Sequence, residues 1–280
     1  MTSHVREHAP AKINLALHVT GRRPDGYHML DSLVCFCSVG DVVTVSREGT
    51  PGLRLAGPFG HRLSAGTDNL VMRAAALAGA ATLSMTLEKH LPPASGIGGG
   101  SADAAATLRA VARLLGTANP DPDTVLGLGA DVPVCLAGRP ARMRGIGDLL
   151  EPVPAMPPAW LVLVNPGVEV PTPQVFAALG VRDNPPLPAS LPDWEDANAL
   201  AAWLGDQRND LEAPARFRAP VIGSVIAALE AQPDCLLARM SGSGATCFGL
   251  FSRKSQADRA RADIARVAPD WWVAAGEVLR

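Results

Sequence analysis

The chain has 280 residues, of which 48% are hydrophobic and 19% are charged, and its formal net charge is −2 at pH 7. This composition is typical of a globular protein, and the length allows one large domain or two of ordinary size. The near-neutral charge argues against a nucleic-acid partner. No apolar run reaches the roughly 18 to 20 residues of a membrane-spanning helix, and the polar start of the chain does not resemble a signal peptide. We therefore expect a cytoplasmic protein that binds neither nucleic acid nor a membrane.

Cysteine and lysine are used sparingly. The five cysteines form no CxxC pair and have no histidine nearby at metal-ligand spacing, so we expect reduced packing residues. Among 25 basic residues only Lys12, Lys89 and Lys254 are lysine. In a chain so rich in arginine, a lysine hints at a function that a guanidinium group cannot perform.

The periodicity of apolar residues predicts mixed strands and helices, which is typical of an α/β or α+β protein. The predicted strands are Pro10–Val19, Ser32–Val39, Val42–Ser46, Leu83–Leu87, Trp160–Val164, Thr246–Phe251 and a segment that runs to Leu136 after Gly129–Pro133. The predicted helices are Asn69–Ala81, the residues from the glycine loop to Leu115, a short stretch after Asn119–Asp123, a stretch from Gln174, Val221–Ala231 and Gln256–Val267. Turns and loops are expected at Gly21–Gly26, Gly49–Gly66 and Asp183–Asp193.

Four prolines fall within the eight residues from Glu151 to Pro158. Such a change in composition is typical of a linker. We therefore predict an N-terminal domain over residues 1–153 and a C-terminal domain over residues 154–280.

The densest signal is a glycine loop, L-P-P-A-S-G-I-G-G-G-S-A, that opens directly into an amphipathic helix ending before Gly116. Consecutive glycines let the backbone approach an anion, and the helix N-terminus adds N–H donors and the positive end of a dipole. The loop lacks the Lys-Ser/Thr of a Walker A motif and the last glycine of a Rossmann fingerprint. The residues alone favour a phosphate site over a purely structural turn, although N-capping by Ser101 would also explain that serine.

Two charged residues stand in apolar surroundings. Lys12 interrupts an alternating strand, and Asp131 lies between Gly129 and Pro133 in an apolar run. Phosphoryl transfer needs positive charge near the moving group and often a carboxylate that takes a proton. The alternatives are a lysine at the end of a strand that reaches water, and an aspartate that serves as a turn or cap residue.

Three segments together resemble the motifs of the GHMP small-molecule kinases: P-A-K-I-N-L-A-L with G-Y-H downstream, P-P-A-S-G-I-G-G-G-S-A, and S-G-S-G-A-T-C-F. The stretches G-R-R-P-D-G-Y-H, L-G-A-D-V-P-V and P-G-V-E-V-P-T-P extend the match collinearly over nearly the whole chain. They resemble the branch of the family that acts on a cytidine diphosphate derivative of methylerythritol. The resemblance implies a two-domain α+β fold with the active site in the cleft between the domains.

By this resemblance the chain would transfer a phosphoryl group from ATP to the 2-hydroxyl of that derivative, in the non-mevalonate route to isoprenoid precursors. Asp131 would take the hydroxyl proton, and Lys12 would keep the carboxylate ionised and steady the acceptor oxygen. The resemblance assigns ATP binding to Asn69, Lys89, Pro92, Pro93, Ala94, Ser95, Gly96, Ile97, Gly98, Gly99, Gly100, Ser101 and Ala102. It assigns acceptor binding to Asn14, Tyr27, His28, Thr172, Phe176 and Gly242.

The glycine motif departs from the usual family pattern, which more often has serines where Gly99 and Gly100 stand. Backbone N–H groups and Ser101 are then left to bind phosphate. Magnesium is expected because the γ-phosphoryl group needs neutralising, and we expect phosphates and water to supply most of its ligands.

Two other functions stay open from the sequence alone. A different GHMP kinase, acting on homoserine or mevalonate, would leave the Tyr27-His28 pair without a nucleobase. A non-catalytic nucleotide-binding module would need neither Lys12 nor Asp131. The oligomeric state, monomer or homodimer, is also open.

Overall fold

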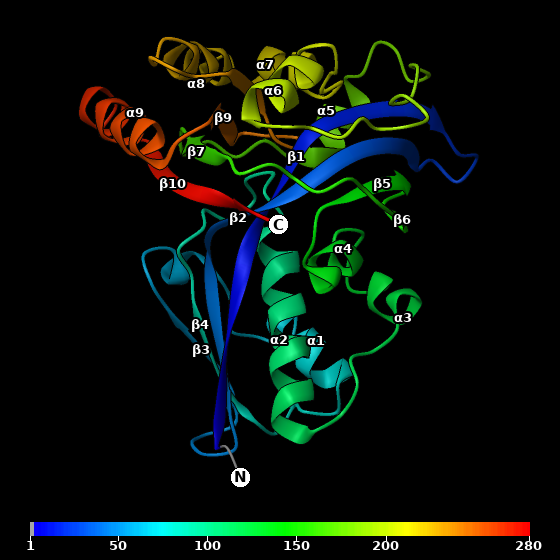
Figure 1. Ribbon diagram of the computed structural model, residues 1–280. Helices are drawn as coiled ribbons and strands as arrows, with labels where there is room; N and C mark the ends of the chain where they lie inside the picture. The colour runs from blue at the N-terminus through cyan, green and yellow to red at the C-terminus, as the bar shows by residue number, and fades with distance from the viewer. Residues whose placement is uncertain (1–2) are drawn as a thin grey trace. The chain divides into compact units, whose positions relative to one another are not determined.

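The computed structural model describes residues 3–280 and has the expected α+β character (Figure 1). The strands are β1 His4–Arg22, β2 His28–Ser46, β3 Gly52–Ala56, β4 Ser84–Glu88, β5 Ala141–Gly145, β6 Leu149–Pro152, β7 Trp160–Asn165, β8 Leu237–Met240, β9 Cys247–Phe251 and β10 Trp272–Leu279. The helices are α1 Leu70–Leu77, α2 Gly99–Leu115, α3 Pro122–Leu126, α4 Val132–Ala137, α5 Thr172–Ala177, α6 Ala197–Gly205, α7 Glu212–Arg218, α8 Val221–Glu230, α9 Lys254–Val267 and the 3-10 helix η1 Gly60–Arg62.

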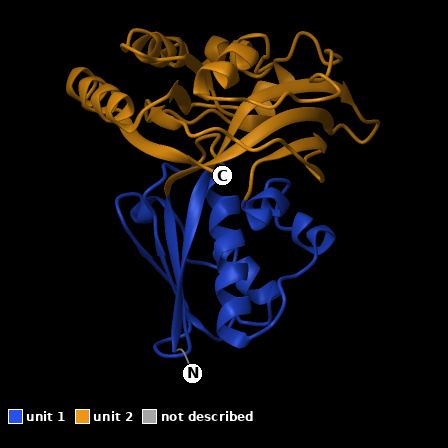
Figure 2. Ribbon diagram, viewed as in Figure 1, with its two compact units in different colours: residues 1–11, 40–93, 98–138 blue, residues 12–39, 94–97, 139–280 orange. Residues whose placement is uncertain are grey.

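The chain forms two compact units that are interleaved along the sequence (Figure 2). The first unit contains the residues up to 11 together with 40–93 and 98–138, and the second contains 12–39, 94–97 and 139–280. Strands β1 and β2 each supply residues to both units. The domain boundary expected between residues 153 and 154 stays a prediction.

The first unit combines a small sheet with a group of helices. The second half of β2 pairs antiparallel with β4, so that Val42 lies opposite Glu88, and β3 runs parallel to β4. Helix α2 packs against α1 and α4. The core between these helices contains Ala74, Ala104 and Leu108, since small and branched side chains at helical spacing face inward.

The second unit is built on a larger sheet in the order β2-β10-β7-β9-β8; β1 and β5 also pair with β2, and β6 pairs with β5. The pairs β10–β7, β7–β9 and β8–β9 are antiparallel. Helix α8 packs against β8 and β9, and α9 packs against β7 and β10. Apolar residues of β7 and β9 meet those of α8 in one core, with Val164, Phe251 and Val225 fully buried.

Most predicted elements are confirmed with small shifts at their ends, but three expectations are wrong. The segment to Leu136 is helix α4, not a strand: Pro133 fits the first turn of a helix, and a short apolar run does not distinguish the two structures. The predicted strands on either side of Gly40 are one strand, β2, which passes so close to the backbone of Ala9 that a Cβ atom at position 40 would collide with the Ala9 carbonyl oxygen. Ser101 is not the N-cap of α2, since Gly98 occupies that position in a left-handed conformation.

Several elements had no clear signal in the sequence. The Gly49–Gly66 stretch contains strand β3, whose partner β4 satisfies its backbone groups. Strands β5, β6, β8 and β10 and helices α6 and α7 were not predicted either. The helix predicted from Gln174 begins two residues earlier, at Thr172.

Candidate functional site

The glycine loop, residues 92–98, has a backbone that few side chains would permit. Gly96 and Gly98 have φ of 76° and 63°, and Ala94 also has a positive φ of 50°. A Cβ atom on Gly96 would lie 2.6 Å from the carbonyl oxygen of Ser241. The loop therefore needs glycine both for its conformation and for the close approach of another segment.

That segment is S-G-S-G-A-T, the third motif of the sequence. It belongs to the second unit and contacts Ser95 and Gly96 of the loop. The Ser241 hydroxyl donates to the Gly96 carbonyl at 3.1 Å, and the Thr246 N–H donates to the Ser95 carbonyl at 3.1 Å. The Lys12 N–H donates to the Ile97 carbonyl at 3.0 Å. Gly242 has φ of 56°, and its carbonyl accepts a hydrogen bond from the Asn209 side chain at 2.9 Å. The three sequence motifs thus meet around one loop.

The loop leads into the N-terminus of α2 in a form suited to an anion. Gly98 is the N-cap and has no side chain, so the N-cap residue itself does not cap the first-turn N–H groups. Those groups have no carbonyl within their own helix to bind, and they add to the positive end of the dipole. The backbone at Gly98–Ser101 is therefore suited to an anion such as phosphate, and its assignment to ATP stays a prediction.

Lys12 lies in a buried polar network of the second unit. Only 4% of Lys12 is exposed, and its Nζ donates to Asn14 Oδ1 at 2.9 Å. The Asn14 amide donates to the Ser32 hydroxyl at 2.8 Å, and the Asn14 N–H donates to the Ser241 hydroxyl at 3.1 Å. The alternative that Lys12 reaches water from a strand end is therefore wrong. A buried ammonium group fixed by neighbours is suited to stabilising negative charge.

Asp131 stands at the N-cap position of α4, in the first unit. Its side chain makes no capping hydrogen bond to that helix, so capping does not explain the residue. The far end of α4 is held by Arg109, which donates to the Cys135 carbonyl at 2.8 Å, to Glu7 at 3.1 Å and to the His8 carbonyl at 3.0 Å. These bonds fix the position of the short helix that begins at Asp131.

Two of the residues expected to bind the acceptor, His28 and Phe176, form an aromatic pair in the second unit. His28 stacks on Phe176, with ring centroids 4.7 Å apart and an interplanar angle of 23°. Tyr27, which directly precedes His28 in the sequence, is 62% exposed. His28 Nε2 is buried and has no hydrogen-bond partner among residues 3–280. Burial, followed by the charges of Arg22 and Arg182, lowers the pKa of His28, which favours a neutral ring.

The other predicted site residues have local partners. The Thr172 hydroxyl lies 2.7 Å from that of Ser243, so the start of α5 is tied to the third motif. Asn69 is the N-cap of α1: its Oδ1 accepts from the Val71 N–H at 2.9 Å, and its Nδ2 donates to the Ser64 carbonyl at 2.7 Å. Lys89 is 2% exposed, and its Nζ donates to Asp41 and Asp103, each at 2.6 Å. The contacts of Asn69 and Lys89 with adenosine stay predictions.

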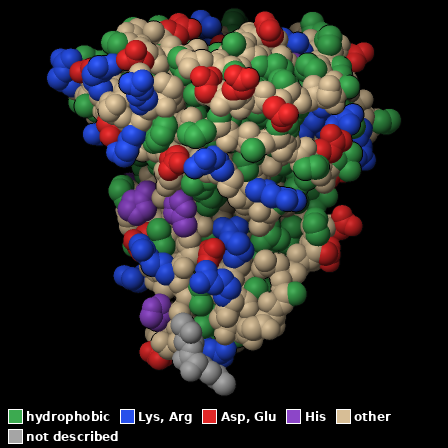
Figure 3. All heavy atoms as spheres, in the orientation of Figure 1, with side chains coloured by type: hydrophobic (Ala, Val, Ile, Leu, Met, Phe, Trp, Pro, Cys, Tyr) green, Lys and Arg blue, Asp and Glu red, His purple; other side chains and the backbone are tan. Residues whose placement is uncertain are grey.

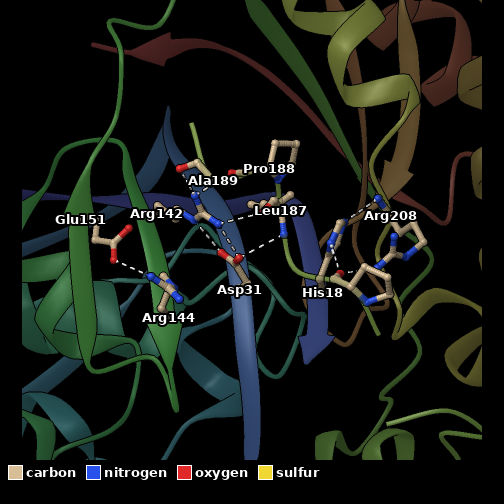
Figure 4. A network of polar contacts seen from close by, with 10 residues as sticks. His18, Asp31, Arg142, Arg144, Glu151, Leu187, Pro188, Ala189 and Arg208 are labelled. Carbon is tan, nitrogen blue, oxygen red and sulfur yellow. Dashed lines mark hydrogen bonds and ion pairs between the residues drawn. The ribbon is translucent and has the colours of Figure 1, made fainter. Parts of the chain in front are cut away.

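Sequence reasoning missed a second buried ion pair, Asp31 with Arg142 (Figure 4). The guanidinium group donates to both carboxylate oxygens, at 2.8 and 2.6 Å, and also to the carbonyls of residues 187–189. The Leu187 N–H donates back to Asp31 at 3.1 Å. This pair fastens the proline-rich loop to β2 and β5. No signal in the sequence could have found it, because the two residues are 111 positions apart.

On the face shown in Figure 3, Lys and Arg side chains are mixed with Asp and Glu side chains. Over residues 3–280, no three or more His, Cys, Asp or Glu side chains are grouped so as to hold a metal ion. In the same part of the chain, no helix has the length and hydropathy needed to cross a bilayer.

Comparison with known proteins places the chain in a family. The model of the GHMP kinases N terminal domain matches residues 69–149, and the model of the GHMP kinases C terminal domain matches residues 187–270. The chain belongs to the GHMP kinase family. It is therefore a small-molecule kinase with an alcohol-type acceptor, and family membership implies ATP as the co-substrate.

Individual relatives extend the likeness over almost the whole chain. The 4-diphosphocytidyl-2-C-methyl-D-erythritol kinase of Cereibacter sphaeroides is 59% identical over 272 residues, which cover 97% of this chain and 98% of the relative. The protein of the same name from Paracoccus denitrificans is 58% identical over 275 residues, covering 98% and 97%. A crystal structure of 4-(cytidine 5'-diphospho)-2C-methyl-D-erythritol kinase superposes with a TM-score of 0.80 at 36% identity and covers 98% of this chain and 99% of that one. The family suggested by the sequence motifs is thus confirmed.

Proposed function

We propose that this GHMP kinase transfers the γ-phosphoryl group of ATP to the 2-hydroxyl of 4-diphosphocytidyl-2-C-methyl-D-erythritol, in the non-mevalonate route to isoprenoid precursors. The observation that carries the choice of acceptor is the stacked pair of His28 and Phe176, with the exposed ring of Tyr27 next to His28 in the sequence. These three residues are called the aromatic group below. The names of relatives close to 60% identical support the same choice.

The aromatic group suits a nucleobase. Rings that stack on a base contribute about 1–3 kcal/mol each, and stacking needs an accessible face. Tyr27 is the only tyrosine of the chain, and its side chain is largely exposed. His28 adds a neutral ring whose buried Nε2 is unpartnered within residues 3–280, so a polar atom of a base would satisfy it. Homoserine and mevalonate have no ring to use this group.

The nucleotide would bind at the glycine loop. Uncapped N–H groups at the start of α2 would bind the triphosphate, with the Ser101 hydroxyl nearby in the first turn. Magnesium bound to the phosphates would neutralise the γ-phosphoryl group, as kinase chemistry requires. Since the described residues offer no carboxylate cluster for a metal, phosphates and water would supply most of its ligands.

Asp131 would act as general base on the acceptor hydroxyl, and Lys12 would keep that carboxylate ionised and stabilise the acceptor oxygen. The burial of Lys12 supports this role, because electrostatic stabilisation is strongest away from water. The side chain of Asp131 supports it as well, since it does not cap its helix.

Two variants test these roles. Asp131→Asn keeps the shape of the side chain but cannot accept a proton, so we expect kcat to fall by about 10² to 10⁴ while ATP still binds. In Lys12→Ala we expect kcat to fall by a similar factor or more, because the positive charge of Lys12 and the orientation of the base are both lost. The measurement is steady-state ADP release alongside ATP binding by calorimetry. Wild-type kcat in Asp131→Asn, or a change in Lys12→Ala confined to the KM for ATP, would refute the assigned roles.

A further inference from the structure

Three buried charged residues of the first unit join the two ends of the glycine loop. Lys89 directly follows β4 and begins the segment that enters the loop. Asp103 lies in α2, which follows the loop, and Asp41 belongs to β2. Lys89 Nζ donates to both carboxylates at 2.6 Å, and the three side chains are at most 3% exposed. We call this group the loop clamp.

Asp41 holds the entry of the loop. Its Oδ1 accepts hydrogen bonds from the backbone N–H groups of His90, at 2.5 Å, and Leu91, at 2.8 Å. Its Oδ2 accepts from Lys89 Nζ. Three N–H donors thus satisfy this carboxylate.

Asp103 holds the exit of the loop, and its hydrogen bonding is incomplete. Its Oδ2 accepts from Lys89 Nζ, but its buried Oδ1 has no partner within residues 3–280. The ammonium group also lies close to the first residue of α2, since a Cβ atom on Gly99 would be 3.0 Å from Lys89 Nζ. A displacement of the ammonium group would therefore reach the first residues of α2.

The charges of the clamp do not balance if every group is ionised. One ammonium and two carboxylates leave a net charge of −1, which is costly without water. His8 of β1 also interacts with Asp41, but burial lowers the pKa of His8, so it does not supply the missing positive charge. A single proton on one carboxylate would make the group neutral.

We propose that the loop clamp consists of ionised Asp41, Lys89 in its ammonium form and protonated Asp103, and that it positions the glycine loop for ATP. The proton satisfies the second oxygen of Asp103 and lets that carboxyl group donate a hydrogen bond to Asp41. Lys89 is then a positioning residue whose side chain acts through the loop. The proposal rests on the proposed function only in taking the glycine loop as the ATP site.

The electrostatic environment agrees with this assignment. Burial, together with the nearby charge of Asp41, raises the pKa of Asp103 to about 8, although Lys89 acts in the opposite direction. Burial alone would lower the pKa of Lys89, but the two carboxylates outweigh it and raise that pKa. The ammonium form therefore persists at neutral pH.

A matched pair of amide substitutions tests the proposal. Asp103→Asn imitates the protonated carboxyl group, because its amide can accept from Lys89 and donate to Asp41; the ATP dissociation constant should not change. Asp41 accepts hydrogen bonds from three N–H groups. In Asp41→Asn one of its two oxygens becomes an NH2 group, which repels one of these donors, so ATP binding should weaken by about tenfold to a hundredfold. Calorimetry with MgATP and no acceptor gives both constants, and thermal unfolding shows whether each variant folds. The KM for the acceptor should stay unchanged in both.

Infrared spectroscopy reports the proton directly. The wild-type protein should show a protonated carboxyl band at neutral pH that is lost in Asp103→Asn. If Asp41→Asn does not fold, Gly99→Ala replaces it: its methyl group would press on Lys89 and weaken ATP binding more than Gly100→Ala, whose methyl group would meet only the tip of Leu70 at 3.2 Å.

Three results would overturn the proposal: Asp103→Asn as damaging to ATP binding as Asp41→Asn, wild-type ATP binding in folded Asp41→Asn, or no carboxyl band that depends on Asp103. Because these measurements need no acceptor, an error in the proposed acceptor would leave them unaffected. A wild-type protein that bound no ATP would instead refute the proposed function.

Discussion

Removal of the Arg142 guanidinium group should destabilise the second unit by several kcal/mol. Its side chain is 7% exposed, that of Asp31 is 2% exposed, and five hydrogen bonds leave the guanidinium group. In Arg142→Met, Asp31 would keep its hydrogen bond from the Leu187 N–H and lose its cation. Two charge-assisted bonds at about 1.5–3 kcal/mol each give a loss of about 3–6 kcal/mol. Removing one partner of a buried pair typically costs about 3–5 kcal/mol, in agreement with that sum.

The same strand offers a matched control. Arg144 also lies in β5, and it pairs with Glu151 at 2.9 Å, but both side chains are close to half exposed (Figure 4). Exposed pairs contribute about 0–1 kcal/mol, so Arg144→Met should change stability little.

Urea unfolding followed by tryptophan fluorescence measures the difference, because all five tryptophans lie in the second unit. We expect a large decrease in the urea midpoint for Arg142→Met and almost none for Arg144→Met. Equal midpoints for the two variants would show that the buried pair does not anchor the 187–189 loop.

Two further predictions concern the acceptor site and the effect of pH. Tyr27→Ala should weaken acceptor binding by about 1–3 kcal/mol and leave ATP affinity nearly unchanged. Tyr27→Phe keeps the ring and should bind the acceptor more tightly than Tyr27→Ala does. Calorimetry with each substrate measures both affinities, and equal weakening for both substrates would mean that Tyr27 supports the fold. His18 accepts from the Arg208 N–H and bonds the Pro185 carbonyl, each at 3.1 Å, and burial, followed by the charge of Arg208, lowers its pKa below the ordinary value of 6.5. The contribution of His18 to stability is therefore complete above pH 6.5 and is lost as the pH falls from there through the folded-state pKa. His18→Gln should make the free energy of unfolding less dependent on pH in this range. Identical pH profiles of the unfolding free energy for the variant and the wild-type protein would contradict the assignment.

The sequence predicted the fold best where local chemistry determines structure. The glycine loop, the helix that ends before Gly116 and the strand at Pro10–Val19 all depend on neighbours within a few residues, and all are present. The period-two pattern of that strand predicts burial of one face only, but residues 10–19 are buried on both faces. The V-P-V-C-L run of α4 was assigned wrongly, because five apolar residues fit either a buried strand or a short helix.

The features that the sequence did not predict depend on contacts between distant segments of the chain. Lys89 drew notice as one of three lysines, yet its carboxylate partners lie 48 and 14 positions away, and nothing in the sequence connects them. The interleaving of the two units also escaped prediction, since β1 and β2 have the pattern of ordinary strands while supplying residues to both. For the candidate site, the sequence motifs indicated the residues and the protein family. The structure added the hydrogen bonds that hold their side chains.

The most direct test of the proposed function is phosphorylation of a panel of acceptors by the purified full-length chain with MgATP. The panel contains 4-diphosphocytidyl-2-C-methyl-D-erythritol, homoserine and mevalonate, and the readouts are ADP release and the mass of the product. We predict rapid, stoichiometric ADP release and a singly phosphorylated product with the cytidine diphosphate compound, and neither with the other two. Turnover of homoserine or mevalonate without turnover of the cytidine diphosphate compound would contradict the proposed function.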